Sequence, residues 1–142
     1  MEQEFKHTTP VQIRINDIDV LGHVNNNAYF AYYDLGKENY IRDILGVDFA
    51  TGRVLPVIAN INATFLEPIF YGDELNVLTR VSHLGNKSFT LEQKAVSKKS
   101  GHTMCECTTV MVCVDMETKQ SIPIPDDYRK AIEIYEDLQT EK

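Results

Sequence analysis

The 142-residue sequence lacks the features that mark several large classes of protein. It has no apolar run long enough to cross a membrane as a helix. Residues 1–6 contain neither the basic nor the apolar region of a secretory signal peptide. Basic residues are outnumbered 14 to 21, and the net charge of -7 argues against broad binding to nucleic acid or to an acidic membrane. We therefore expect a soluble, cytoplasmic protein without a nucleic-acid or membrane partner; a small anionic ligand held by a local basic patch stays open.

Cysteine is scarce as well, with only Cys105, Cys107 and Cys113. An odd number of cysteines, all within residues 105–113, does not make a disulfide framework. The Cys-x-Cys spacing differs from that of common zinc sites, and no second pair of ligands follows. If this segment is a strand, all three side chains point to one face. We therefore expect buried, reduced thiols and no metal site.

Alternating apolar and polar residues predict five strands. The first spans residues 11–16 and places Val11, Ile13 and Ile15 on its buried face. Four longer strands follow from residue 57 onward, and turn-forming residues separate them at regular intervals. The turns are expected at residues 68–73, 84–87 and 98–101. Consecutive strands joined in this way are antiparallel.

A long helix is predicted between the first strand and the others. It runs from about Asn26 to Leu45, with Asn25 or Asn26 as its N-cap and Gly46 at its end. Its first two turns are apolar nearly all round, which indicates a largely buried helix. Gly36, in the middle, costs roughly 1 kcal/mol relative to alanine. Such a cost is tolerable if a neighbouring segment must pass close to this position.

A second, shorter helix is predicted near the C-terminus, where Asp126 or Asp127 can cap it. Apolar side chains then recur at helical spacing. The length of the chain predicts one domain, residues 1–142. A meander of long strands that curves around one buried helix gives an α+β architecture.

The junction between the first strand and the long helix concentrates polar residues. Asp17, Asp19 and His23 precede three asparagines at 25–27, and an aromatic run over 29–33 follows at once. Acidic and amide groups packed against apolar sequence indicate either a helix start or an active site. We interpret this junction as both.

The order of elements and this junction resemble the hotdog-fold acyl-CoA thioesterases of the 4-hydroxybenzoyl-CoA thioesterase-like family. The resemblance covers about residues 11–128 and is strongest over Arg14-x-x-Asp17-x-Asp19-x-x-Gly22-His23-Val24-Asn25-Asn26-x-x-Tyr29; Lys87-Ser88-Phe89 is a supporting match. It implies a long central helix wrapped by a curved antiparallel five-stranded sheet, with a short C-terminal helix. It also implies an acyl-CoA substrate, no separate cofactor, and a homodimer or homotetramer with sites at the subunit interface.

The resemblance further assigns roles to single residues. The second acid of the pair carries catalysis in that family, so Asp19 is expected to act as nucleophile or general base. The backbone N–H near Asn26 would face the thioester carbonyl oxygen, and Lys87 and Ser88 would lie near the CoA phosphates or the pantetheine arm. Plant acyl-carrier-protein thioesterases of this fold use an Asn two residues after the Asp. Leu21 stands there in this chain, so that role is absent.

The roles of the other junction residues in thioester hydrolysis are less specific, and each has two possible roles. His23 either takes part in catalysis or orients the loop, and Asn25 either orients the substrate or caps the helix. An apolar slot must hold the acyl chain, and aromatic and strand residues are expected to line it: Tyr29, Phe30, Tyr33 and Ile61.

Other interpretations remain open at this stage. Asp17 and Asp19 are also ordinary turn or cap residues, and Asp17 is expected to be structural. Asp34 and Glu38, one turn apart on the helix, would suit a hotdog lineage that places its carboxylate there. A hotdog hydratase or dehydratase would carry a His with an acidic partner and a Phe-Pro segment, which the chain lacks. A non-catalytic acyl-CoA-binding or regulatory module is the rival outside the enzymes.

Overall fold

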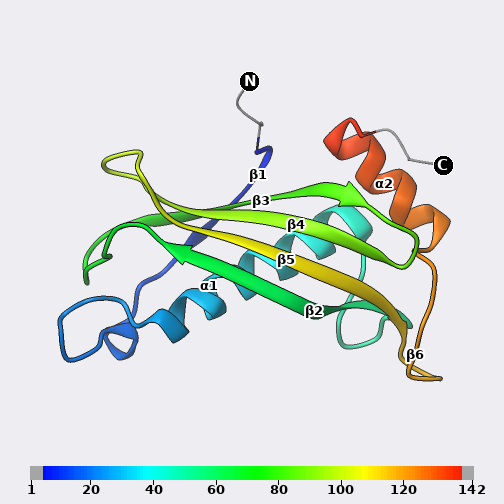
Figure 1. The fold of residues 1–142 in the computed structure, drawn as a ribbon, viewed down its shortest axis with the longest axis horizontal. Helices are drawn as coiled ribbons and strands as arrows, with labels where there is room; N and C mark the ends of the chain where they lie inside the picture. Colours follow the sequence, from blue (N-terminus) through cyan, green and yellow to red (C-terminus); the bar gives the residue numbers. More distant parts are fainter. Residues whose placement is uncertain (1–4, 139–142) are drawn as a thin grey trace.

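A long helix lies against one curved antiparallel sheet in the computed structural model, which describes residues 5–138 (Figure 1). In chain order the elements are β1 (His7–Val11), a 3-10 turn (Ile15–Asp17), α1 (Asn26–Tyr40), a π-helical turn (Ile41–Leu45), β2 (Val54–Phe65), β3 (Leu75–Leu84), β4 (Ser88–Ser97), β5 (Thr103–Asp115), β6 (Gln120–Ser121) and α2 (Asp126–Glu136). Neither helix of this described part of the chain has the length and apolar composition to cross a bilayer.

The sheet has the strand order β1-β3-β4-β5-β2, and every neighbouring pair is antiparallel. The two-residue β6, which the sequence did not predict, adds to β5 beyond this path. Residues alternate between buried and partly exposed along β3 and β4, so one face of the sheet covers α1. The structure therefore confirms the predicted α+β architecture, in which a sheet of five main strands, four of them long, curves around a central helix.

The predicted long helix is α1 together with the π-helical turn that follows it, and it begins and ends as predicted. Asn25 is its N-cap, and its side-chain oxygen accepts a hydrogen bond from the Asn27 N–H at 2.9 Å. The helix continues through the π-helical turn to Gly46, whose φ of 69° ends it in the left-handed region. Tyr33 and Tyr40 are fully buried in its middle and last turns. Both ends follow from local cap chemistry, which explains why the sequence identified them.

Gly36 lets the sheet approach α1 closely. A Cβ atom at this position would lie 2.7 Å from Val77 Cγ1 and 2.9 Å from Gln93 Nε2. Gln93 is itself fixed, because its Nε2 donates to the Tyr33 carbonyl at 3.0 Å. A neighbouring segment was expected to pass close to Gly36, and this segment is the sheet, through the side chains of Val77 and Gln93.

The predicted first strand over residues 11–16 is wrong in its position. The strand β1 ends at Val11, and Ile15 is exposed, although Val11 and Ile13 are buried. The carboxylate of Asp17 accepts hydrogen bonds from the Arg14 N–H at 2.9 Å and from Arg14 Nη2 at 3.2 Å. These contacts tighten the chain into the 3-10 turn and interrupt the strand pattern.

The cap predicted for the second helix is also wrong. Pro125 is the N-cap of α2, and it offers no side-chain hydrogen bond to the helix. Asp126 and Asp127 lie in the first turn instead. There the acidic side chains still lie near the positive end of the helix dipole, so the predicted cap was only one or two residues from the observed one.

The three cysteines lie buried on the inner face of β5 as free thiols, as expected from their parity. Cys105 and Cys107 belong to the core around the first half of α1, and Cys113 to the core around its second half and α2. Burial raises the pKa of Cys105 and Cys113 to about 11. Within residues 5–138, no group of three potential ligands is placed to hold a metal ion.

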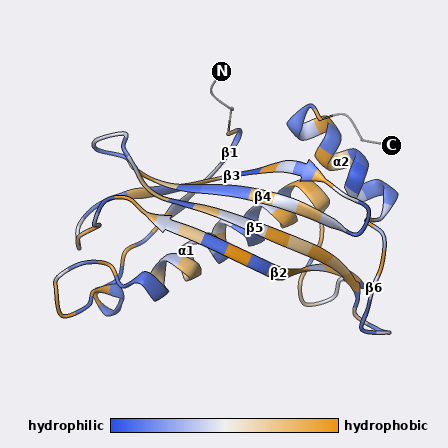
Figure 2. Cartoon of the chain, viewed as in Figure 1, coloured by the Kyte–Doolittle hydropathy of each residue, from blue (hydrophilic) through white to orange (hydrophobic). Residues whose placement is uncertain are grey.

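The strand β2 forms one edge of the sheet, because it pairs with β5 on one side only. Its side chains are mostly exposed, and among them Val57, Ile58 and Phe65 are between 39% and 46% exposed. Figure 2 shows bands of apolar and polar residues alternating along this strand. An edge with both apolar side chains and free backbone groups is suited to pairing with another strand.

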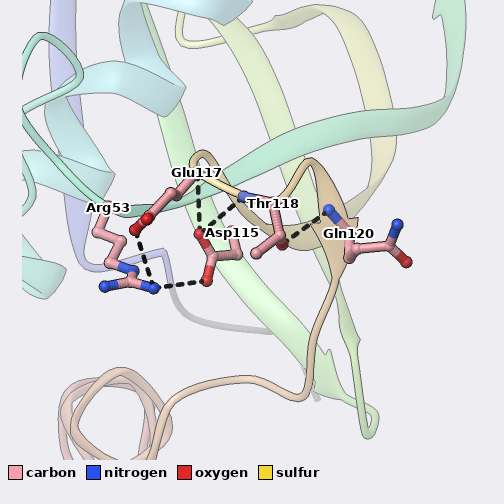
Figure 3. Close-up of polar contacts among 5 residues, drawn as sticks. All are labelled: Arg53, Asp115, Glu117, Thr118 and Gln120. Atoms are coloured by element: carbon pink, nitrogen blue, oxygen red, sulfur yellow. Dashed lines mark hydrogen bonds and ion pairs between the residues drawn. The ribbon is translucent and has the colours of Figure 1, made fainter.

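The start of β2 is tied to the turn between β5 and β6 (Figure 3). Arg53 Nη2 lies 3.4 Å from Asp115 Oδ2 and 3.1 Å from Glu117 Oε2. Asp115 Oδ1 accepts from the Glu117 N–H at 2.9 Å and from the Thr118 N–H at 3.4 Å. These hydrogen bonds, that from Glu117 above all, hold the pKa of Asp115 below its usual value.

Candidate active site

The loop between the 3-10 turn and α1 is closed around Asp19. Asp19 Oδ1 accepts from the Leu21 N–H at 2.9 Å and from the His23 N–H at 3.3 Å. The Asp19 N–H in turn donates to the His23 carbonyl at 2.9 Å. Gly22 takes a φ of 84°, a conformation that favours glycine and closes the loop. The other carboxylate oxygen, Oδ2, accepts no hydrogen bond from the described residues, so it is left for a ligand or water.

Asp17 serves the structure of the loop. It is buried and accepts from the Tyr32 hydroxyl at 2.7 Å, besides its two bonds from Arg14. Its backbone carbonyl accepts from the Asn25 N–H at 2.7 Å, which fixes the start of α1. Burial alone would raise the pKa of Asp17, but the hydrogen bonds from Tyr32 and Arg14 outweigh it and hold this pKa below the usual value.

The first turn of α1 presents one free backbone donor. The Asn27 N–H is bonded to the Asn25 side chain, and the Ala28 N–H to the Asn25 carbonyl. Asn26 is the first helical residue, so its N–H has no partner within the helix. No other acceptor for this N–H occurs in the part of the chain that the structure describes. The partial positive charge of the helix end adds to its capacity to bind an oxyanion.

Asp19 and this helix end line the same cavity, of about 390 Å³. One wall is polar and comes from the loop and the helix start; the other comes from Tyr29 and the end of β2. The lining residues are Asp19, Leu21, His23, Val24, Asn25, Asn26, Tyr29, Phe65, Leu66, Glu67 and Pro68. The rings of Tyr29 and Phe65 meet edge to face, with centroids 5.0 Å apart. Burial raises the pKa of Tyr29 to about 12, so its phenol stays neutral at physiological pH.

His23 is positioned at the rim of this cavity. Its ring meets Phe70 edge to face at 5.1 Å between centroids, and its backbone forms a bridge with the same residue. Neither ring nitrogen is bonded to another described residue, and His23 is one of the residues that line the cavity. Phe70 and the segment 65–68 were missed by sequence reasoning. Their one signal was the run Phe65-Leu66, which breaks the alternation of β2 just before Pro68.

The structure brings together five of the predicted site residues. Tyr33, Lys87 and Ser88, and the expected slot residues Phe30 and Ile61, do not line this cavity. Around the cavity lie Asp19, His23, Asn25, Asn26 and Tyr29. Tyr33 is fully buried in the core and does not line the cavity.

Lys87 and Ser88 lie at the hairpin between β3 and β4, at the opposite end of the sheet from the Asp19 loop (Figure 1). Ser88 pairs with Val112, whereas Phe65 pairs with Cys105, seven residues away on β5 and about 23 Å along the strand. Within one chain these two residues are therefore remote from the cavity. Their role toward CoA stays a prediction.

A long helix held in a curved antiparallel sheet, with a polar loop at the helix start, is the arrangement of the hotdog fold. Residues 13–132 match the model of the Thioesterase-like superfamily. The match covers most of the sequence, so this chain belongs to the Thioesterase-like superfamily.

Individual relatives agree with this assignment. A thioesterase from Thermus thermophilus, solved with coenzyme A and Zn, is 29% identical with a TM-score of 0.85, over 99% of this chain and 100% of that one. A putative thioesterase from Pseudomonas aeruginosa is also 29% identical, with a TM-score of 0.83, over 91% of this chain and 99% of that one. The long-chain acyl-CoA thioesterase FadM of Escherichia coli is 23% identical over 88% of this chain and 96% of its own length.

Proposed function

We propose that this chain is an acyl-CoA thioester hydrolase, which converts an acyl-CoA and water to a carboxylic acid and CoA. One observation carries the proposal: Asp19, whose Oδ2 accepts no hydrogen bond from the described residues, and Asn26, whose N–H has no acceptor among them, line the same cavity. A carboxylate and an oxyanion donor on either side of one carbonyl group are what thioester cleavage requires.

In the proposed reaction the thioester carbonyl oxygen faces the Asn26 N–H. Asp19 Oδ2 either removes a proton from a water molecule that attacks the carbonyl carbon, or attacks that carbon itself, with water cleaving the resulting anhydride. The negative charge that develops on the carbonyl oxygen is stabilised by the N–H and the helix dipole, and the C–S bond breaks to release CoA thiolate, which takes up a proton. The scheme uses no cofactor beyond the CoA of the substrate.

The other residues of the cavity have supporting roles. His23 contributes its open ring nitrogens as donor or acceptor near the thioester, and Asn25 keeps the helix start in place through its bond to Asn27. Tyr29 and Phe65 supply the apolar wall for the first part of the acyl chain. The named relatives support an acyl-CoA substrate, since one is called a long-chain acyl-CoA thioesterase and another was solved with coenzyme A. Three free thiols suit a reducing compartment and so support a cytoplasmic location.

The proposed assembly is a homodimer, or a homotetramer built from it, with sites at the subunit interface. The edge strand β2 has free backbone groups and exposed apolar side chains, and its last residue, Phe65, lines the cavity. Antiparallel pairing of two β2 strands would join the sheets of two chains and cover this edge. Lys87 and Ser88 would then reach a CoA molecule only from a different subunit.

The test is release of free thiol from a panel of short, long and aromatic acyl-CoAs. We expect turnover of at least one, and a fall in kcat of roughly 10²–10⁴-fold in Asp19→Asn, the usual contribution of a general base. Asparagine keeps the Oδ1 acceptor for the Leu21 and His23 N–H groups, so the loop should keep its shape.

Asp127→Asn, on the exposed first turn of α2, is the matched control and should keep full activity. No turnover on any substrate would refute the proposed function. Full activity in Asp19→Asn would refute the assignment of the catalytic residue alone.

A further inference from the structure

The two sides of the Asp19 loop, residues 18–24, are joined by backbone hydrogen bonds whose base lies at the start of α1. The Asp17 carbonyl accepts from the Asn25 N–H at 2.7 Å, and the Asp19 N–H donates to the His23 carbonyl at 2.9 Å. An isolated β-bridge joins the two sides between these bonds. The bond from Asn25 to Asp17 is therefore the base of the loop, where the chain passes from the loop into the helix.

Both groups that the proposed reaction uses lie next to this base. Asp19 comes two residues after Asp17, and Asn26 comes one residue after Asn25. The distance between the Asp19 carboxylate and the Asn26 N–H therefore depends on how firmly the bond between Asp17 and Asn25 is held. Catalysis is sensitive to this distance, because reacting groups must be placed to within about 0.5 Å of their productive positions.

The side chain of Asp17 fixes this base. Its carboxylate is buried, and three donors reach it: the Tyr32 hydroxyl at 2.7 Å, the Arg14 N–H at 2.9 Å and Arg14 Nη2 at 3.2 Å. Arg14 precedes the loop, whereas Tyr32 belongs to the second turn of α1. Asp17 thus joins the segment before the loop, the helix cap and the body of the helix.

The Tyr32 hydroxyl is the donor that α1 itself supplies to this carboxylate. Tyr32 and Asp17 are each 5% exposed, so solvent has little access to the bond between them. A buried carboxylate that loses one of its donors is costly, and it moves toward another donor to recover the loss. Such a movement also shifts the carbonyl of the same residue, and with it the Asn25 N–H that is bonded to this carbonyl.

We propose that Tyr32 and Asp17 are positioning residues for the thioesterase reaction: their buried hydrogen bond holds the Asp19 carboxylate and the Asn26 N–H in a fixed arrangement. Neither Tyr32 nor Asp17 is among the residues that line the cavity, so both act through other groups. This inference rests on the proposed function, because it uses the roles assigned there to Asp19 and Asn26.

The first experiment compares kcat and KM of wild type and Tyr32→Phe for an acyl-CoA that wild type cleaves, at a temperature where circular dichroism shows both proteins folded. We expect kcat to fall at least about ten-fold, since a misplacement of about 1 Å can cost about 100-fold. KM should stay nearly unchanged, because the apolar wall of Tyr29 and Phe65 is not altered.

Tyr128→Phe is the matched control. It removes a hydroxyl hydrogen bond of similar length, 2.8 Å to the Val54 carbonyl, from the core around the second half of α1. This change should lower the free energy of unfolding and leave kcat unchanged. A kcat of Tyr32→Phe equal to that of wild type, or a fall matched by Tyr128→Phe, would overturn the inference.

Two further comparisons separate positioning from a general loss of structure. Asp17→Asn keeps a side-chain oxygen for the Tyr32 hydroxyl and the Arg14 N–H, whereas Asp17→Ala removes it, so asparagine should restore most of the kcat that alanine loses. In the Asp19→Asn background, Tyr32→Phe should lower the residual rate by a smaller factor than in wild type, because part of its effect acts through Asp19. Equal rates in the two Asp17 variants, or equal factors in the two backgrounds, would contradict the proposal.

Hydrogen exchange tests the positioning without turnover. The Asn25 N–H should exchange at least about ten-fold faster in Tyr32→Phe than in wild type, as expected for a local opening. The Ile124 N–H, bonded to the Asn86 carbonyl at 2.9 Å at the other end of the sheet, should keep its rate. If wild type cleaves no acyl-CoA, the proposed function fails, and this exchange alone decides whether Tyr32 holds the helix start. Equal acceleration at both amides, or none at Asn25, would refute that role.

Discussion

Gly36→Ala tests whether the close approach of α1 to the sheet limits the stability of the fold. The new Cβ would lie 2.7 Å from Val77 Cγ1, 2.9 Å from Gln93 Nε2 and 3.1 Å from Thr79 Oγ1. Optimal contacts between carbon atoms are about 3.5–4.0 Å, so the helix and sheet must separate locally by about 1 Å. Gln93 opposes this movement, because its amide donates both to the Tyr33 carbonyl and to Thr79.

Two opposing contributions set the expected size of the effect. Overpacking of a tight core costs about 1–3 kcal/mol. Alanine returns about 0.5–1 kcal/mol relative to glycine in a helix interior. The free energy of unfolding should therefore fall by about 1 kcal/mol, and by no more than about 2.5 kcal/mol, measured by urea denaturation of wild type and Gly36→Ala at equal protein concentration.

Ala31→Gly supplies the matched control on the same helix. Ala31 is exposed, so this change removes helix propensity without touching the sheet, and it should cost roughly 1 kcal/mol. A Gly36→Ala protein as stable as wild type, or more stable, would show that the sheet does not constrain this position and would refute the reasoning.

Two further predictions concern Asp17. Tyr32→Phe removes the 2.7 Å hydrogen bond to its buried carboxylate and should lower the free energy of unfolding by about 1–3 kcal/mol in urea denaturation; an unchanged value would show that the bond is replaced by solvent. Because the pKa of Asp17 is lowered in the folded chain, its contribution to stability is present above the unfolded value of 3.8 and is lost as the pH falls through the folded pKa. Unfolding measured from pH 7 to pH 3 should thus show a shallower acid-dependent loss in Asp17→Asn than in wild type, and parallel curves would contradict this account.

Sequence reasoning succeeded where the signal is local. The ends of α1 follow from Asn25 and Gly46, and the hairpin turns follow from residues with turn chemistry. It failed at β1 because two local signals compete there. The alternation through Ile15 favours a strand, but Arg14 and Asp17 bond to each other and bend the chain. The pairing of β1 with β3 depends on residues more than sixty positions away, which periodicity does not register.

The candidate site divides in the same way. Asp19, His23, Asn25 and Asn26 are close in sequence, so one motif identifies them. The opposite wall, at Phe65–Pro68, belongs to the site only because the fold brings the end of β2 against the ring of Tyr29 at the helix start. Outside the site, the burial of Lys37 could not be predicted either, since a lysine on a helix is usually solvated and its burial depends on the strands that cover it.

The buried thiols of β5 can report how often the core of the protein becomes exposed to solvent. Cys105, Cys107 and Cys113 combine lack of access with a raised pKa, so little reactive thiolate meets reagent in the native state. In an activity assay, a thiol reagent would therefore react with the thiol of released CoA and not with the cysteines of the protein. Left without substrate, the same reagent modifies the cysteines only as the sheet separates from α1, and the rate of that modification reports how often the core becomes exposed.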